Sequence, residues 1–170
     1  MTLAELNRLE RAQFVATLGE IFEHSAWVAE EAFARRPFAS LDSLHEAMMA
    51  AVRDAGQEKQ LALVRAHPEL AGREAVEGAL TAHSTSEQSR LGFDRLSRAE
   101  LERMRELNRR YREKFGFPCI VALKLHASRD SVIAAFDARL QNDAGTELAS
   151  ALEQVGHIAH ARLEKLIGRP

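Results

Sequence analysis

The chain has 170 residues, of which 46% are apolar and 28% charged, with a formal net charge of −2, so we expect one globular domain with its own core. This balance offers no clustered basic surface for nucleic acid, and no window approaches the roughly 18 apolar residues that span a bilayer. One cysteine, Cys119, and no signal-peptide pattern at the N-terminus predict a cytoplasmic protein.

Helices are favoured throughout the first part of the chain, because glycine and proline number only 9 and 4. Apolar residues recur at helical spacing in four segments. The segments are 11–25, 25–37, 40–56 and 57–66. Ser40 or Asp42 is expected to cap the third helix, and the fourth ends where His67 meets Pro68.

The second part of the chain begins with a loop over 69–83. Helices are then predicted to start at Ser84 and Ser97, each with glutamate three residues later, the pattern of a capping box. The helix from Ser97 ends at Gly116. The apolar run 119–125 has no second strand to pair with, so we expect buried extended chain or a helical turn. Two further helices, over 128–142 and 144–168, complete an all-α, single-domain bundle of about eight helices over 1–170.

His67 is the first candidate for chemistry. A histidine at the end of a helix is stabilised by the helix dipole, and that structural role is the simpler interpretation. Histidine also titrates near neutral pH, and a neighbouring proline would fix its backbone. The sequence therefore leaves a helix stop and a general acid or base both open.

The stretch STSEQ, residues 84–88, is the second candidate. Ser84 and Glu87 can form an ordinary capping box, which needs no ligand. A helix N-terminus also attracts anions, so Ser84, Glu87 and Gln88 could bind a small polar molecule. A carboxylate near His67 would raise the pKa of that histidine.

Other sites find less support. His157 and His160 share a helix face, but the Glu-x-x-His repeats of a bundle metal site are missing from the sequence, so no metal is expected. Cys119 stands in an apolar run, where cysteine is usually an inert hydrophobe. The sequence has neither a phosphate-binding P-loop nor a Gly-x-Ser-x-Gly elbow.

Several motifs occur together in a specific order. They are IFEHSAWVAEEAFARRPFASLDSLHEAM, RAHPELAGR, LTAHSTSEQSRLGFDRLS, LNRRYREKFGFPCIVAL and AAFDARLQND. Over almost the whole chain this combination resembles the OHCU decarboxylase family (2-oxo-4-hydroxy-4-carboxy-5-ureidoimidazoline decarboxylase). The resemblance implies an all-helical homodimer that needs no cofactor or metal. It also implies the last step from urate to (S)-allantoin, on an anionic ureido-imidazoline.

The resemblance also implies roles for individual residues. His67 matches the catalytic histidine and Glu87 the essential glutamate. The substrate-contacting positions match Pro68, Ser84, Gln88, the backbone of Cys119, Ile120, Val121, Ala122 and Leu123, and Arg162. Arg139 is the alternative to Arg162, because it also stands in a matching Ala-Arg-Leu. Cys119 replaces the phenylalanine that the family usually has.

Two other functions stay open on the sequence alone. One is a related decarboxylase for another cyclic ureide. The other is a non-enzymatic helical module that binds partners through the loop at 66–83 and the charged helix from Ser97. An enzyme predicts that His67 and Glu87 converge on one small ligand, whereas a scaffold does not.

Overall fold

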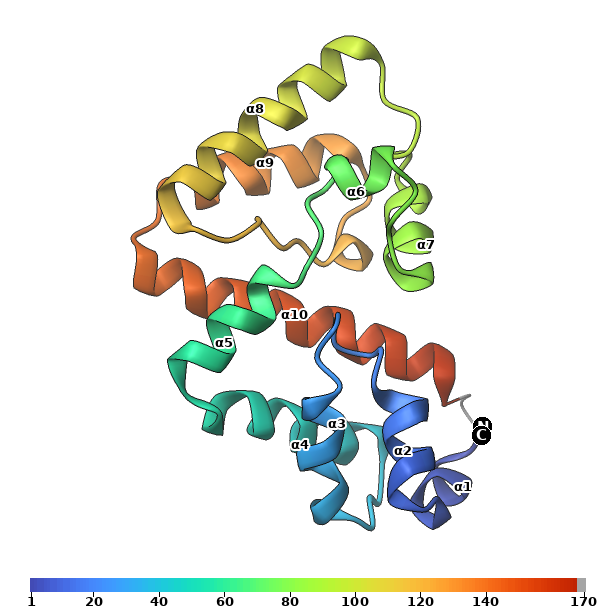
Figure 1. Cartoon of the computed structure of the whole chain (residues 1–170). Helices are drawn as coiled ribbons and strands as arrows, with labels where there is room; N and C mark the ends of the chain where they lie inside the picture. Colours follow the sequence, from blue (N-terminus) through green and yellow to red (C-terminus); the bar gives the residue numbers. More distant parts are fainter. Residues whose placement is uncertain (168–170) are drawn as a thin grey trace. The chain divides into compact units, whose positions relative to one another are not determined.

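The structure, a computed structural model, describes residues 1–167, without the side chains of residues 74 and 76. All regular elements among these residues are helical, which confirms the predicted all-α class (Figure 1). The α-helices are α1 (Leu3–Arg8), α2 (Arg11–Leu18), α3 (Trp27–Ala32), α4 (Leu41–Asp54), α5 (Gly56–Arg65), α6 (Arg73–Val76), α7 (Ala82–Arg90), α8 (Arg98–Phe115), α9 (Arg129–Arg139) and α10 (Ala144–Leu166). Two 3-10 helices are η1 (Phe33–Arg35) and η2 (Leu123–Leu125). The short α1 and α6 raise the number above the expected eight.

Several predicted helix ends are confirmed, but the helix predicted over 11–25 already ends at Leu18. Ser40 caps α4, and Ser97 and Glu100 form the predicted capping box of α8. Gly116 ends α8 with φ 75°, a left-handed conformation that glycine adopts without a Cβ penalty. The predicted end of the last helix, Gly168, lies outside the described residues.

The predicted start of α7 is wrong. The helix begins at Ala82, and the Thr81 hydroxyl is its cap, accepting a hydrogen bond from the Ser84 backbone N–H at 3.3 Å. Ser84 is therefore the third helical residue rather than the cap. Glu87 lies well inside the helix, so it does not occupy the capping-box position that the sequence pattern assigned to it.

The chain divides into two compact units. One comprises Met1–Ala66 and the segment from Gly156 onward, and the other His67–Val155. The first unit has a core that includes Leu6, Phe14, Leu44, Met48 and Leu163. The single domain over 1–170 stays a prediction.

The second unit contains the three segments that the sequence singled out, 67–72, 84–88 and 119–123. Its core has an aromatic cluster in which Tyr111 lies 4.7 Å from Phe115 and 5.4 Å from Phe136, measured between ring centroids. The opposite face of α8 carries exposed pairs such as Arg98–Glu102, as expected for a solvated helix face.

Residues 119–122 are buried and form no helix or strand, Ala122 is extended with φ −73° and ψ 91°, and η2 follows directly. Extended chain and a helical turn were predicted as alternatives for 119–125, and the run shows the first at Ala122 and the second at η2. Within residues 1–167, no helix has both the length and the apolar character needed to cross a membrane.

Candidate active site

His67 lies immediately after the end of α5. The C-cap of that helix is Ala66, whose N–H donates to the Ala62 carbonyl at 3.1 Å. The His67 side chain is buried, with 6% of the residue exposed. Pro68 disfavours a helical backbone at His67, which accounts for the end of the helix at this point.

The loop after His67 has an unusual backbone. Ala71 has φ 49°, a left-handed conformation that is uncommon outside glycine. The Gly72 N–H donates to the Glu69 carbonyl at 3.2 Å, which closes a tight turn. A Cβ at Gly72 would lie 2.6 Å from the Glu69 Cβ, so this position requires glycine.

Gln88 joins α7 to this loop. Its Oε1 accepts from the Ala71 N–H at 3.0 Å, and its Nε2 donates to the Glu69 carbonyl at 3.3 Å. Ser84 lies one turn earlier on the same face, and both side chains are buried. Glu87 is half-buried.

The last turn of α7 also reaches the segment 119–126. The Arg90 guanidinium donates from Nη2 to the Leu123 carbonyl, and to the His126 carbonyl at 3.1 Å. Helix α7 thus brings together the three predicted site segments, which are separate in the sequence. The substrate contacts assigned to individual residues stay predictions.

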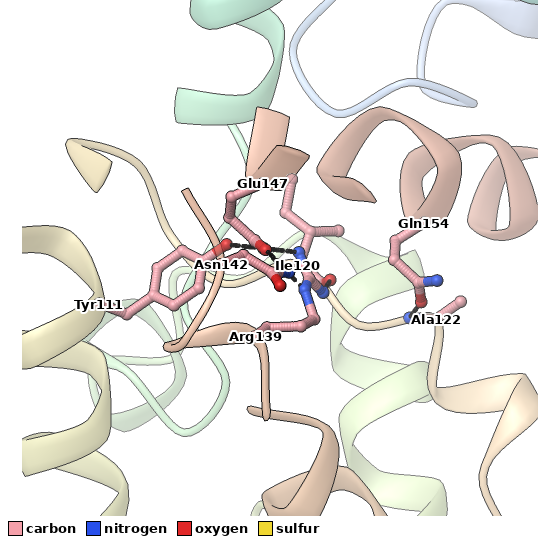
Figure 2. A network of polar contacts seen from close by, with 7 residues as sticks. All are labelled: Tyr111, Ile120, Ala122, Arg139, Asn142, Glu147 and Gln154. Atoms are coloured by element: carbon pink, nitrogen blue, oxygen red, sulfur yellow. Dashed lines mark hydrogen bonds and ion pairs between the residues drawn. The ribbon is translucent and has the colours of Figure 1, made fainter. Parts of the chain in front are cut away.

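A buried polar network holds the segment 119–123 from another side (Figure 2). Arg139 donates from Nε to the Glu147 carboxylate at 2.7 Å and from Nη1 to the Ile120 carbonyl. Tyr111 and Asn142 also donate to Glu147, the latter at 2.9 Å.

Gln154 completes the support of this segment. Its Oε1 accepts from the Ala122 N–H at 2.9 Å (Figure 2). At least one N–H that the sequence assigned to substrate is therefore already hydrogen-bonded within the protein. The backbone of 119–123 has a fixed geometry because Arg90, Arg139 and Gln154 each bind one of its polar groups.

The same environment determines the character of two titratable groups. Burial raises the pKa of the Cys119 thiol to about 12, so it is protonated at neutral pH. Burial, followed by the neighbouring Cys119 and the hydrogen bond to Glu147, also raises the pKa of the Tyr111 hydroxyl. Neither is poised as a nucleophile or base, in agreement with the inert role expected for Cys119.

Arg162 lies in the first unit, on α10. Its side chain is 1% exposed, and Nη1 forms an ion pair with the Glu23 carboxylate at 2.8 Å. The same nitrogen donates to the Ile21 carbonyl at 3.3 Å. Arg139 makes comparably extensive contacts in the second unit, so burial and pairing do not separate the two candidate substrate arginines. The assignment of Arg162 stays a prediction.

The sequence did not single out Asn108 or Glu147 as site residues. Asn108 follows Met104 by four residues and so lies on the buried face of α8, where it donates to the Leu70 carbonyl at 2.9 Å. Glu147 precedes Ala151 by four residues on the buried face of α10. A polar residue in an apolar helical stripe was the signal that could have found both.

A cavity of about 500 Å³ lies beside the same loop. Its lining includes Ala71, Gly72, Asn108 and Arg105, together with the ion pairs Glu69–Arg112 and Arg73–Glu77. It borders the loop without including His67 or Glu87 in its lining.

The fold and the contacts of α7 define an all-helical protein in which three predicted site segments are grouped. Comparison with known proteins gives the particular family. The profile of the OHCU decarboxylase family matches residues 7–164. The chain belongs to this family and is therefore a carboxy-lyase.

Curated relatives support this membership over nearly their full lengths. The 2-oxo-4-hydroxy-4-carboxy-5-ureidoimidazoline decarboxylase of Haloferax volcanii is 45% identical, covering 96% of this chain and 94% of that protein. The decarboxylase of the same name from Mus musculus is 36% identical, covering 99% and 94%. A solved (S)-allantoin synthase has a TM-score of 0.77 at 34% identity, covering 98% of this chain and 54% of the other.

Proposed function

We propose that this protein decarboxylates 2-oxo-4-hydroxy-4-carboxy-5-ureidoimidazoline to (S)-allantoin and CO₂, the last step from urate to allantoin. The observation that carries the proposal is family membership over residues 7–164. The grouping of the three predicted segments around α7 supports the same site.

The chemistry of the substrate defines what the protein has to supply. The carboxylate and a hydroxyl share one ring carbon, and the neighbouring ring carbon carries the ureido group and a C=N bond. When the C–CO₂ bond breaks, its electron pair forms a C=C bond and the C=N electrons move to nitrogen. The substrate therefore contains its own electron sink, and the proposed reaction needs no cofactor or metal. Protonation of the ureido-bearing carbon then converts the enol carbon into a carbonyl, and the hydroxyl proton passes to the ring nitrogen, which gives allantoin.

His67 acts as the proton donor in this proposal. A proton delivered to one face of the ureido-bearing carbon fixes the (S) configuration, and a histidinium can supply it near neutral pH. Its burial and the adjacent proline support the role, because a proton donor must keep one orientation. Glu87 orients the substrate hydroxyl or keeps His67 protonated.

The remaining predicted residues hold the ring. Ser84, Gln88, Pro68 and the backbone of 119–123 contact the ureido and ring amides, and Arg162 pairs with the carboxylate or a ring carbonyl. The rigid support of 119–123 is consistent with this role, since fixed donors cost no reorganisation during the reaction.

The protein works in the cytoplasm as a homodimer in this proposal, and neither nucleic acid nor a membrane takes part. Light scattering coupled to size exclusion tests the assembly. A monomeric mass at assay concentrations would contradict the dimer without affecting the reaction.

Replacing His67 tests the proposal directly. The unstable substrate is generated in situ from urate, and (S)-allantoin is followed by circular dichroism. His67→Ala should lose most of the enzymatic acceleration and the preference for the (S) product, because uncatalysed protonation has no preferred face. We expect a loss of at least about a hundredfold in kcat, in the range for a positioned general acid.

His45→Gln is the matched control. It replaces a histidine in the first unit, and glutamine can still donate to the Gly156 carbonyl that His45 contacts at 2.9 Å. This variant should keep nearly wild-type kcat. A His67→Ala enzyme with wild-type acceleration would remove His67 from the mechanism.

A further inference from the structure

The backbone of Glu69, Leu70 and Ala71 is bound by two side-chain amides from other helices. Gln88 of α7 accepts from the Ala71 N–H at 3.0 Å and donates to the Glu69 carbonyl at 3.3 Å. Asn108 of α8 donates to the Leu70 carbonyl at 2.9 Å. Three consecutive residues thus each give one backbone group to a glutamine or asparagine.

This loop needs external support. Leu70 and Ala71 are buried, and a buried backbone group without a partner is unfavourable. Ala71 also holds a left-handed φ of 49°, which alanine leaves readily when nothing restrains it. Without the two side-chain amides, the loop would change conformation, because its buried backbone groups would lack partners and Ala71 could leave its left-handed conformation.

Asn108 is well suited to provide that restraint. It is buried on the central part of α8, between Met104 and Tyr111, so its own position is fixed by packing. Its bond reaches the middle of the loop, three residues after His67. Glu69 adds an ion pair with Arg112, one turn further along the same helix, at 2.8 Å.

We propose that Asn108 is a positioning residue for the decarboxylation, holding the loop 67–72 in the conformation that presents His67 to the substrate. The inference rests on the proposed role of His67 as proton donor. Asn108 acts through the loop backbone and is not itself a catalytic residue. Small errors in placing a reacting group cost large factors in rate, so the hydrogen bond should affect turnover more than folding.

Asn108→Ala tests this directly. Water from the adjoining cavity, which Asn108 lines, can then hydrate the Leu70 carbonyl, so folding should survive. We expect kcat to fall about 10- to 100-fold, with a clearly smaller change in KM. Asn108→Leu keeps the side-chain volume but lacks the hydrogen-bond donor. It should also lower kcat much more than it changes KM.

Asn7→Ala is the matched control. The Asn7 side chain binds the backbone of Phe38 in the first unit, donating to its carbonyl at 2.8 Å and accepting from its N–H at 2.9 Å. The variant loses both hydrogen bonds between the Asn7 amide and the Phe38 backbone. This loss should lower the melting temperature, while kcat stays within about twofold of wild type. A purely structural role for Asn108 predicts that both variants behave alike.

The imidazole signals of His67 in NMR spectra give a readout independent of turnover. They should shift or broaden in Asn108→Ala and stay unchanged in Asn7→Ala. Wild-type kcat and unchanged His67 signals in both Asn108 variants would overturn the inference. If the signals move but His67→Ala stays active, the proposed role of His67 fails, and only the effect of Asn108 on the conformation of the loop stands.

Discussion

Arg139 and Glu147 show how a buried charge pair can serve a backbone segment. The Glu147 side chain is 0% exposed and that of Arg139 13%. Burial of charges is costly, so a pair gives little net stability compared with apolar residues, but the loss of one partner is severe. The pair instead fixes the position of a backbone segment, because the Arg139 guanidinium also donates to the Ile120 carbonyl.

Glu147→Ala should therefore be strongly destabilising. It leaves the Arg139 guanidinium without its carboxylate and removes the acceptor for the Tyr111 hydroxyl and the Asn142 amide. We expect the free energy of unfolding to fall by about 3–5 kcal/mol, measured by urea unfolding. Glu147→Gln retains an acceptor oxygen and should lose less. A loss below about 1 kcal/mol in Glu147→Ala would show that the network contributes little.

Single residues were predictable only in part. His67 stood out because a histidine before proline at a helix end is visible within two residues. Asn108 and Glu147 were not predicted, because their partners are distant in the sequence. Asn108 binds Leu70, 38 residues away, and Glu147 binds Tyr111, 36 residues away. Local sequence carries no information on such distant pairing, beyond the presence of a polar residue in an apolar stripe.

At the scale of helices, the same Ser-x-x-Glu pattern was correct once and wrong once. Ser97 and Glu100 form a capping box, with the Ser97 N–H donating to Glu100 at 2.7 Å. Ser84 and Glu87 do not cap α7, because Thr81 offers a hydroxyl one turn earlier and the helix extends back to it. A cap pattern locates a helix start only where no other capping residue precedes it.

Thr81 and Glu87 can be separated by mutation. Thr81→Ala should lower the free energy of unfolding by about 1 kcal/mol through loss of the cap. Glu87→Gln should change it by less than about 0.5 kcal/mol, because this residue lies outside the cap, while the decarboxylation slows. Urea unfolding and the circular-dichroism assay on both variants provide the comparison. A Glu87→Gln protein that is destabilised but fully active would instead make Glu87 a structural residue.

For the whole molecule, composition and helical periodicity were sufficient to predict an all-α fold. The division of the chain was not predictable, because the first unit combines its N-terminal 66 residues with the segment from Gly156 onward. Helix α10 contributes to both units as one uninterrupted helix. Periodicity identifies the helix but does not indicate that its two ends pack in different cores.

The pH dependence of global stability should report on His45, at the contact between α4 and α10 within the first unit. The His45 and His160 rings pack edge to face with their centroids 5.1 Å apart. The acidic residues Asp42 and Glu46 also interact electrostatically with His45. Burial lowers the pKa of His45, and His160 lowers it further, against the opposing effects of the Gly156 carbonyl and the two acids. Below the ordinary histidine pKa of about 6.5, the unfolded chain therefore binds a proton more readily than the folded protein.

Protonation at this position should accordingly reduce stability as the pH falls below about 6.5, and leave it unaffected above that value. In His45→Gln this contribution disappears, while the titration of groups distant from position 45 remains common to both proteins. The difference in unfolding free energy, wild type minus variant, should hence be constant between pH 7 and 8 and decrease towards pH 5. Urea unfolding at each pH measures it. A difference that rises on acidification would mean that Asp42 and Glu46 outweigh burial and that the folded protein binds the proton more tightly.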